Sequence, residues 1–332
     1  MTLYKDHIPK FAVAPMMDWT DKHCRFLHRQ LSQHALLYTE MVVADAIIHG
    51  DQQRLLGYDD SEHPIAVQLG GSDPEKLKIA AKVCEEFGYD EINLNVGCPS
   101  DRVQSGTFGA CLMREPELVA SCVDAMKSVV GIPVTVKCRI GVDEQDEELA
   151  LDELTSHVRG AGVDALWVHA RKAWLDGLSP KENRDIPPLN YERVYRLKDK
   201  NADLFVGING GIADLDTATA QMNYVDGVML GRAAYHNSSL LADVDHLVYG
   251  LKPSQVDWIK VCDAMIDHAK KHMEQGGRLI HITRHMVGLF HGLPGARRYR
   301  QILSTDAVKN DASPDIIRKA LAEVRLPLFE SA

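Results

Sequence analysis

The chain has 332 residues, of which 45% are hydrophobic and 25% are charged. This length can hold one large α/β domain and a smaller one, and the apolar content suffices for a substantial core. The seven cysteines are scattered singly without a C-x-x-C pair, which argues against a zinc ribbon or dithiol redox centre and fits a reducing compartment. The initial MTLYKDHIPK contains no signal-like apolar run, and no segment approaches the roughly 20 apolar residues of a membrane span. We therefore expect a cytoplasmic protein with no membrane association.

The formal net charge of −10 is unevenly distributed along the chain. Residues 251–332 carry 13 Lys+Arg and 9 Asp+Glu, a net of +4, whereas residues 1–250 carry 24 and 38, a net of −14. Charge asymmetry between the two parts of a chain indicates a polyanionic partner. Composition alone leaves an ordinary solvated surface as the alternative.

Eight short apolar runs alternate with segments of helical periodicity, such as Pro74–Phe87, Pro116–Val130 and Glu147–Ala161. Eight strands alternating with helices over about 240 residues predict an α/β fold of the (β/α)8 or TIM-barrel type. A doubly wound sheet is the structural alternative, but it usually has fewer strands, and no G-x-G-x-x-G follows the first run. The predicted strands are Phe11–Pro15, Leu36–Met41, Ile65–Leu69, Glu91–Val96, Val134–Cys138, Leu166–His169, Leu204–Ile208 and Gly227–Leu230.

Each predicted strand is followed by a polar or glycine-rich break. Loops that only close a fold need turn residues, whereas these breaks carry reactive or charged side chains. Because the carboxyl ends of barrel strands meet at one face, such a ring indicates an active site there. A structural polar residue remains the alternative for any single member. The ring consists of Asp18, Glu40, Gln68, Asn95, Cys98, Lys137, His169, Arg171, Asn209 and Arg232.

Cys98 lies just past the fourth predicted strand, in the stretch EINLNVGCPSDRVQSGTFGACLM. Pro99 disfavours helical dihedrals at the residue before it, so we expect the thiol at the mouth of the strand. A glycine-containing loop with Gly106 and Gly109 follows, and Met113 is predicted to open the next helix. Most free cysteines are small buried apolar residues, so the argument for chemistry rests on position.

Two glycine-containing breaks follow the seventh and eighth strands. They are Asn209–Gly210–Gly211 and Gly231–Arg232. Glycines allow backbone N–H groups to approach a phosphate closely, and barrel enzymes often hold a phosphate on these two loops. The pair predicts a phosphorylated cofactor.

The pattern changes after Tyr235. Residues 244–253 are predicted to form the last barrel helix and a linker, and later residues show only helical periodicity. We therefore expect a barrel in residues 1–250 and a small helical domain in residues 251–332. Its predicted helices are Val256–Met273, Leu279–Phe290, Arg297–Leu303 and Ile316–Val324.

Residues 275–305 contain five arginines and no Asp or Glu. Arg297, Arg298 and Arg300 lie near a predicted helix start, where positive charge is unfavourable for the helix dipole. Phosphate binding would explain them, and a solvated helix face is the alternative. His281 and His285 share a helix face, but no third ligand is evident, so we expect no metal site.

Taken together, these segments resemble the tRNA-dihydrouridine synthases, most closely their A subfamily. The resemblance extends from about residue 11 to residue 300. Its most specific parts are the segment around Cys98 and the stretch from HARKAWL to ENR. Further matching segments are APMMDWTDKHCR, LLYTEMV, QLGGSDP, PVTVKCRIG, INGGI, DGVMLGR and HITRHMVGLFHGLPGARRYR.

The resemblance implies reduction of the C5–C6 double bond of uridine in the tRNA D-loop, at U20 and U20a. It implies bound FMN, with NADPH or NADH as reductant, and no obligate protein partner is evident. Cys98 would donate the proton to C5 after hydride reaches C6, and a thiol, with an ordinary pKa of about 8.5, is protonated at working pH. FMN would be held by Ala14, Pro15, Met16, Gln68, Lys137, His169, Asn209, Gly210, Gly211, Gly231 and Arg232. The tRNA would be contacted by Asn95, Lys181, Arg184, Arg297 and Arg300.

Two other functions stay open at this point. An FMN barrel acting on a free pyrimidine, as dihydroorotate dehydrogenases do, would not need the helical domain and its arginines. A catalytically silent RNA-binding protein on a barrel scaffold would not need Cys98, Lys137, His169 and the phosphate loops.

Overall fold

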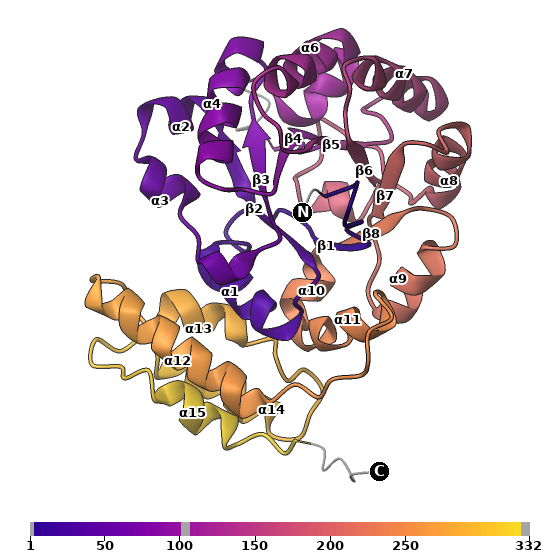
Figure 1. Cartoon of the computed structure of the whole chain (residues 1–332). Helices are drawn as coiled ribbons and strands as arrows, with labels where there is room; N and C mark the ends of the chain where they lie inside the picture. The colour runs from indigo at the N-terminus through magenta and orange to yellow at the C-terminus, as the bar shows by residue number, and fades with distance from the viewer. Residues whose placement is uncertain (1–2, 101–106, 327–332) are drawn as a thin grey trace.

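Eight parallel strands close into a barrel in chain order (Figure 1). The computed structural model describes residues 3–100 and 107–326, so the predicted loop position Gly106 lies outside the described residues. The (β/α)8 prediction is confirmed, with strand ends that differ by a few residues. The strands are β1 (Phe11–Val13), β2 (Leu36–Val43), β3 (Ile65–Gly70), β4 (Glu91–Val96), β5 (Val134–Arg139), β6 (Ala165–His169), β7 (Phe205–Asn209) and β8 (Gly227–Leu230).

Helices surround the barrel, and several of them begin after a residue whose side chain caps the helix. Asp73 precedes one of them and accepts hydrogen bonds from the N–H groups of Glu75 and Lys76, which satisfies donors that a helix start leaves free. Asp146 caps another helix in the same way. The helices of the barrel are α1 (Lys22–Leu31), α2 (Ala44–His49), α3 (Gln52–Leu56), α4 (Pro74–Glu86), α6 (Pro116–Lys127), α7 (Glu147–Gly160), α8 (Tyr191–Lys200), α9 (Leu215–Gln221), α10 (Arg232–His236) and α11 (Val244–Leu247).

Short 3-10 helices take the place of two predicted features. Met113 does not open the helix after β4. It lies in η2 (Gly109–Arg114), and α6 starts at Pro116, a residue suited to the first turn of a helix. The predicted last barrel helix is only the short α11, preceded by η4 (Ser238–Asp243). The other 3-10 helices are η1 (Asp60–Glu62) and η3 (Glu182–Arg184).

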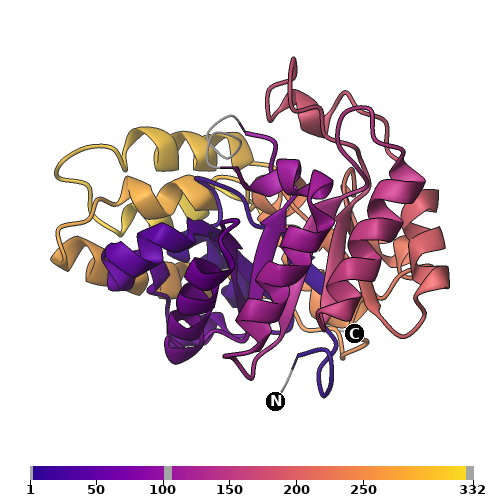
Figure 2. The same ribbon diagram turned by 90° about the horizontal axis from the view of Figure 1, so that it is seen from above.

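Alternate strand residues face outward and inward, which gives the barrel two apolar layers. The outward residues form the large core between strands and helices. The interior is a separate cluster that includes Trp167 and Tyr38, with Tyr4 from the N-terminal segment packed against it. Figure 2 shows this segment at the end of the barrel opposite the loop that carries η3. The interior is therefore packed, and only the opposite end is left for a site.

Trp167 crosses the barrel interior because β7 offers a glycine beside it. A Cβ atom on Gly207 would lie 2.2 Å from Cε3 of the indole. The ring is fully buried, and its N–H donates to the Tyr4 hydroxyl at 3.1 Å. Position 207 therefore requires glycine, because the indole of Trp167 packs directly against its Cα atom.

The four helices that follow α11 form a helical domain beside the barrel (Figures 1 and 2). They pack against the barrel mainly through α1. They are α12 (Trp258–Glu274), α13 (Ile280–Met286), α14 (Ala296–Thr305) and α15 (Ile316–Leu321). In the part of the chain that the structure describes, no helix is long and apolar enough to cross a membrane.

A polar cluster joins the helical domain to the barrel. Asp21 caps α1 and pairs with Arg284 at 2.5 Å and with the ring of His285 at 3.0 Å. The other ring nitrogen of His285 lies 3.1 Å from the hydroxyl of Tyr235, which stacks on Trp19. His281 instead lies 3.0 Å from His272. The two histidines of HITRH therefore have separate partners, and His285 is part of the contact between the domains.

We predict that Gly207→Ala lowers the free energy of unfolding by on the order of 1–3 kcal/mol, because the added methyl group overpacks the indole of Trp167. Gly160→Ala is the matched control, since a Cβ atom at that helical position meets nothing within 4 Å. Urea unfolding of both variants measures the difference. Equal stabilities would show that the barrel interior relaxes around the methyl group.

Candidate active site at the carboxyl ends of the strands

The Cys98 segment is held by the side chain of Asn95. The Asn95 carbonyl oxygen accepts hydrogen bonds from the N–H of Gly97 at 3.0 Å and from the N–H of Cys98 at 2.9 Å. The Cys98 carbonyl accepts from the N–H of Ala110 at 2.9 Å. The thiol is partly buried and lies 3.5 Å from the hydroxyl of Ser100. Cys98 thus follows β4 directly, with its backbone fixed and its side chain at the barrel mouth.

Two cationic side chains of β5 lie next to this segment. Arg139 is buried, and its Nε donates to the carbonyl of Gly97 at 3.0 Å. The amine of Lys137 donates to Asn209 at 3.1 Å. Burial, and then the charge of Arg139, lower the pKa of Lys137 to about 8, and burial lowers the pKa of Arg139 to about 10. Negative charge on Cys98 opposes both shifts, which shows that the three groups are close enough to interact.

The loops after β7 and β8 present backbone donors without partners. Gly210 and Gly211 have φ values of 116° and 69°, which favour glycine. Within residues 3–100 and 107–326, the N–H groups of neither glycine donate to any protein group. A Cβ on Gly210 would lie 2.7 Å from the His169 ring. Only glycine at position 210 therefore lets the backbone of this loop pack so close to the imidazole. The loop after β7 thus holds two free backbone donors next to the His169 ring.

Cations gather beside these donors. Burial lowers the pKa of His169 well below its ordinary value, with Arg139, Lys137 and Arg171 adding to the effect. Arg171 keeps a buried Nε without a hydrogen-bond partner in the described structure. Arg232 pairs with Asp185 at 2.8 Å. A cluster with this excess of positive charge and unpaired donors is suited to binding an oxyanion.

The predicted residues after β1 and β3 also lie at this end of the barrel. Ala14 donates its N–H to the carbonyl of Leu230 at 2.8 Å, which ties the end of β1 to that of β8. The sulfur of Met16 lies 3.4 Å from where a Cβ on Gly231 would be. Pro15 lies between Ala14 and Met16 in the chain. Gln68 is buried in β3 and bonds to side chains of β4.

Apart from Asn95 at the end of β4, the predicted RNA contacts lie on two different parts of the molecule. Lys181 and Arg184 are exposed on the loop after β6, where Lys181 precedes η3 and Arg184 ends it. Arg297 and Arg300 belong to α14 of the helical domain. Neither forms an ion pair with any residue in the described part of the chain. Arg284 and Arg278 of the predicted arginine group instead bond to Asp21 and to the Val308 carbonyl.

Sequence reasoning missed the residues that shape the loop after β6. Asn183 is buried, accepts from the N–H of Trp174 at 2.7 Å, and donates to the carbonyls of Trp174 and Leu178. Arg139 donates to the carbonyls of Asn183 and Lys172. The signal for Arg139 was available, because it lies two residues after Lys137 and so faces the same way. Asn183 lies in the ENR that ends one of the most specific matching stretches, but the sequence did not indicate its structural role.

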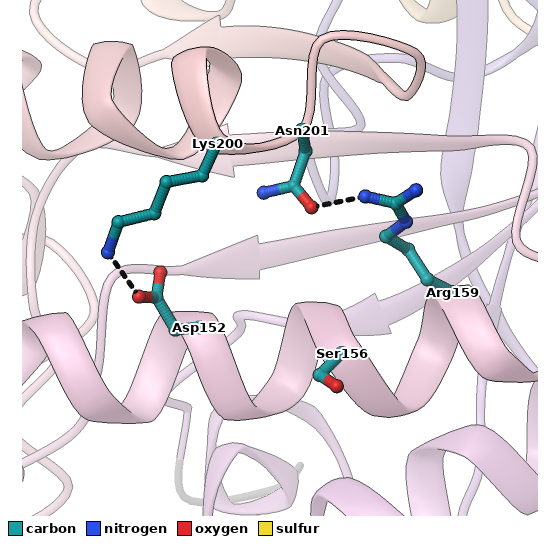
Figure 3. A pocket seen from close by; sticks show the side chains of 5 residues that line it. All are labelled: Asp152, Ser156, Arg159, Lys200 and Asn201. Atoms are coloured by element: carbon teal, nitrogen blue, oxygen red, sulfur yellow. Dashed lines mark hydrogen bonds and ion pairs between the residues drawn. The ribbon is translucent and has the colours of Figure 1, made fainter.

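A hollow between α7 and α8 lies elsewhere on the surface (Figure 3). Its polar groups bond to one another: Lys200 pairs with Asp152 at 2.6 Å, and Arg159 donates to Asn201 at 2.5 Å. Arg159, Lys200 and Asn201 lie at the ends of helices that run opposite to the strands, which is the side of the barrel away from Cys98. Its charged side chains are therefore paired within the described structure, and Ser156 is the remaining polar residue of the lining.

The fold and the polar ring are those of a (β/α)8 barrel enzyme, with cationic side chains and free backbone N–H groups near a thiol at the open end. Among solved structures, the old yellow enzyme homologue from Zymomonas mobilis matches with a TM-score of 0.54 at 13% identity, covering 79% of this chain and 96% of that one. Morphinone reductase matches with a TM-score of 0.52 at 14% identity, covering 76% and 88%. At these identities the matches show the barrel fold alone.

Sequence comparisons identify the family. The family model for dihydrouridine synthase matches residues 12–324. Proteins named tRNA-dihydrouridine(20/20a) synthase are 54% identical in Shewanella oneidensis, covering 96% of this chain and 95% of the relative. They are 51% identical in Vibrio cholerae, covering 96% and 97%. The chain belongs to the dihydrouridine synthase family, which confirms the family predicted from the sequence.

We predict that Lys137→Met raises the free energy of unfolding at pH 7 by on the order of 1–3 kcal/mol. The pKa of Lys137 falls from 10.5 to about 8 on folding, so the folded state bears the cost of a desolvated charge at pH 7. Between about pH 8 and 10.5 the folded amine is neutral while the unfolded amine is still charged. Stability of the native protein therefore rises with pH there, and the advantage of the variant shrinks.

Urea unfolding at pH 7 and pH 9.5 measures this effect. Lys82→Met, on an exposed position of α4, is the matched control and is expected to change little. A Lys137→Met protein less stable than the native one at pH 7 would show that the bond to Asn209 outweighs the cost of burial.

Proposed function

We propose that this protein reduces the C5–C6 double bond of uridine to dihydrouridine at positions 20 and 20a of the tRNA D-loop. The observation that carries the proposal is Cys98, fixed at the mouth of β4 beside Lys137 and Arg139, in a chain of the dihydrouridine synthase family. Relatives at 51–54% identity bear the name tRNA-dihydrouridine(20/20a) synthase. The acceptor would be tRNA, with NADPH or NADH as reductant.

The residues present fit a bound FMN. Its phosphate would meet the free N–H groups of Gly210 and Gly211, with His169, Gly231 and Arg232 beside them. Its ring system would lie toward Gln68, Lys137 and Asn209, against Ala14, Pro15 and Met16. Bound FMN would supply a hydride for C6 of the uracil. Lys137 would stabilise negative charge on a neighbouring oxygen or nitrogen atom.

Cys98 would supply the proton at C5. Hydride addition at C6 leaves an enolate-like negative charge, and a thiol proton transferred to C5 neutralises it. The bond from Asn95 to the N–H of Cys98 fixes the direction from which the proton arrives. Asn95 would also face the uracil.

Residues 1–250 would form the catalytic domain with the FMN site, and residues 251–332 would form the domain that binds tRNA. The helical domain carries Arg297 and Arg300 without acidic partners among the described residues, while the barrel is acidic overall. Lys181 and Arg184 extend the basic surface to the barrel side. Repulsion from the rest of the barrel would help to orient the RNA.

A barrel acting on a free pyrimidine is the second candidate function considered. The arginines of α14 argue against a free pyrimidine as substrate, because a small substrate needs no basic surface on a separate domain. Comparing free uridine with tRNA as electron acceptor separates the two.

We predict that Cys98→Ala separates the two half-reactions. Reduction of the bound flavin by NADPH should persist at nearly the native rate, because Cys98 takes no part in it. Oxidation of the reduced protein by unmodified tRNA should slow by roughly 10²–10⁴-fold, the usual contribution of a positioned general acid. Stopped-flow absorbance of the flavin measures each step alone.

Cys111→Ala is the matched control, since Cys111 is also partly buried but its thiol donates to the Phe108 carbonyl. It should leave both steps unchanged. A native rate of the tRNA step in Cys98→Ala would mean that the proton comes from another group. A correctly folded native protein that takes up no FMN would refute the proposed function itself.

We predict that Arg297→Ala and Arg300→Ala together weaken tRNA binding and flatten its salt dependence by about one unit of slope per lost phosphate contact. Flavin content should stay unchanged. Arg318→Ala is the control, because this exposed arginine of the same domain is already paired with Asp263 at 2.5 Å. Binding measured over a series of salt concentrations decides, and an unchanged slope in the double variant would identify a solvated helix face.

A further inference from the structure

A continuous series of side-chain hydrogen bonds runs up the inside of the barrel, from the packed end to the Cys98 segment. We call it the β4 ladder. It is built on Glu91, Asn93 and Asn95, which alternate along β4 and therefore face the interior. Thr135 of β5 and Gln68 of β3 bridge them from either side. All five side chains belong to buried residues.

The hydrogen bonds of the ladder are short and consecutive. At the closed end, the Thr135 hydroxyl donates to Oε1 of Glu91 at 2.5 Å, and the amide of Asn93 donates to the Thr135 hydroxyl at 2.8 Å. At the open end, the amide of Gln68 donates to Oδ1 of Asn93 at 2.8 Å, and the amide of Asn95 donates to Oε1 of Gln68 at 2.8 Å. Each of the five side chains is thus hydrogen-bonded to the next one in the ladder.

Both ends impose one direction on the ladder. The open end meets the backbone N–H groups of Gly97 and Cys98, which can only donate, so Asn95 must turn its oxygen to them. The orientation of every amide below follows from that. The closed end must therefore be an acceptor, and an ionised carboxylate is the side chain that accepts without donating.

Glu91 meets this requirement. Besides Thr135, the hydroxyls of Tyr4 and Tyr38 donate to its carboxylate, the former at 2.8 Å. Burial raises the pKa of Glu91 to about 7, and these three hydroxyl donors oppose the rise. The negative charge of Asp164 adds to the rise. A proton on Glu91 would make one of its two oxygens a donor and would remove the charge that now holds the three hydroxyl donors in one direction.

The direction decides what Gln68 offers to a ligand. Its oxygen is engaged by Asn95 and one of its two N–H groups by Asn93. Within the described residues, the other N–H is the remaining polar group of this side chain. The unused N–H of Gln68 is therefore held in one orientation, and it suits a hydrogen-bond acceptor such as a carbonyl oxygen or an unprotonated ring nitrogen.

From these contacts we infer that Glu91 is a positioning residue. Through the β4 ladder, its carboxylate fixes the donor that Gln68 presents to the cofactor and the oxygen with which Asn95 holds Cys98. Glu91 itself lies at the closed end and touches neither. The role toward the cofactor rests on the proposed function, whereas the hold on the Cys98 backbone does not.

Glu91→Gln tests the inference, because it keeps the shape of the side chain, removes its charge and replaces one of the two acceptor oxygens by an NH2 donor. We expect exchange of the Gly97 and Cys98 amide hydrogens to accelerate at least tenfold, measured by hydrogen exchange and mass spectrometry without added ligand. We also expect the apoprotein to bind FMN about tenfold more weakly, measured by quenching of flavin fluorescence. FMN affinity of the native protein should rise with pH around 7 more steeply than that of Glu91→Gln.

Thr135→Val breaks the same ladder at its next member and leaves the Glu91 residue unchanged. It provides the test of the inference if Glu91→Gln does not fold. The two changes should not add: the double variant should lose about tenfold in FMN affinity, not a hundredfold. Tyr4→Phe is the matched control, since it removes one donor to Glu91 and leaves the ladder intact. It should change neither amide exchange at residues 97 and 98 nor FMN affinity.

Unchanged exchange at residues 97 and 98 in both ladder variants would overturn the inference. So would equal effects of Tyr4→Phe and Glu91→Gln, because the contact would then be only structural. If the native protein binds no FMN while exchange still accelerates in Glu91→Gln, the proposed function fails and the ladder stands.

Discussion

The structure depends on the constraint that every second residue of a closed barrel faces an interior that cannot be left empty. At one end this space is filled by large rings, and Gly207 makes room for Trp167. At the other end the inward positions are Gln68, Asn95, Lys137, His169 and Asn209. Because the same alternation sets both layers, a polar residue at the open end of a strand has an inward neighbour two residues below it. The site is continuous with the core.

This continuity explains why charge can be held at the barrel mouth. Lys137 and Arg139 lie on one strand, and burial lowers the pKa of each. Arg171 has a buried Nε without a partner in the described structure. Such groups cost stability unless an anion neutralises them, and Asp185 is the only carboxylate paired with the arginines beside the β7 and β8 loops among the described residues. A bound anion is the simplest compensation, and the free N–H groups of Gly210 and Gly211 provide for its remaining oxygens.

Sequence periodicity was sufficient for the barrel and for the ring at its open end. Eight apolar runs and the breaks after them located all eight strands within a few residues, because strand length and turn residues are local properties. Residues whose roles depend on distant partners were not predictable in this way. Asn183 was missed because it bonds within an irregular loop, and Glu91 was taken only as the start of a strand. A buried carboxylate is uncommon enough to draw attention, but its partners Tyr4, Tyr38 and Thr135 come from three separate segments.

The contact between the two domains also involves the loops at the barrel mouth. Asp21 caps α1 immediately after the β1 loop, and the same carboxylate bonds to Arg284 and His285 of α13. His285 reaches Tyr235 of α10, the helix that begins at the Gly231–Arg232 break. The loops after β1 and β8 and the helical domain therefore meet at one carboxylate and one imidazole. A displacement of α13 would strain the cap of α1 and the stacked rings of Trp19 and Tyr235 together. The position of α14, which follows α13, is thus tied to the barrel mouth by bonds that are directional as well as by packing.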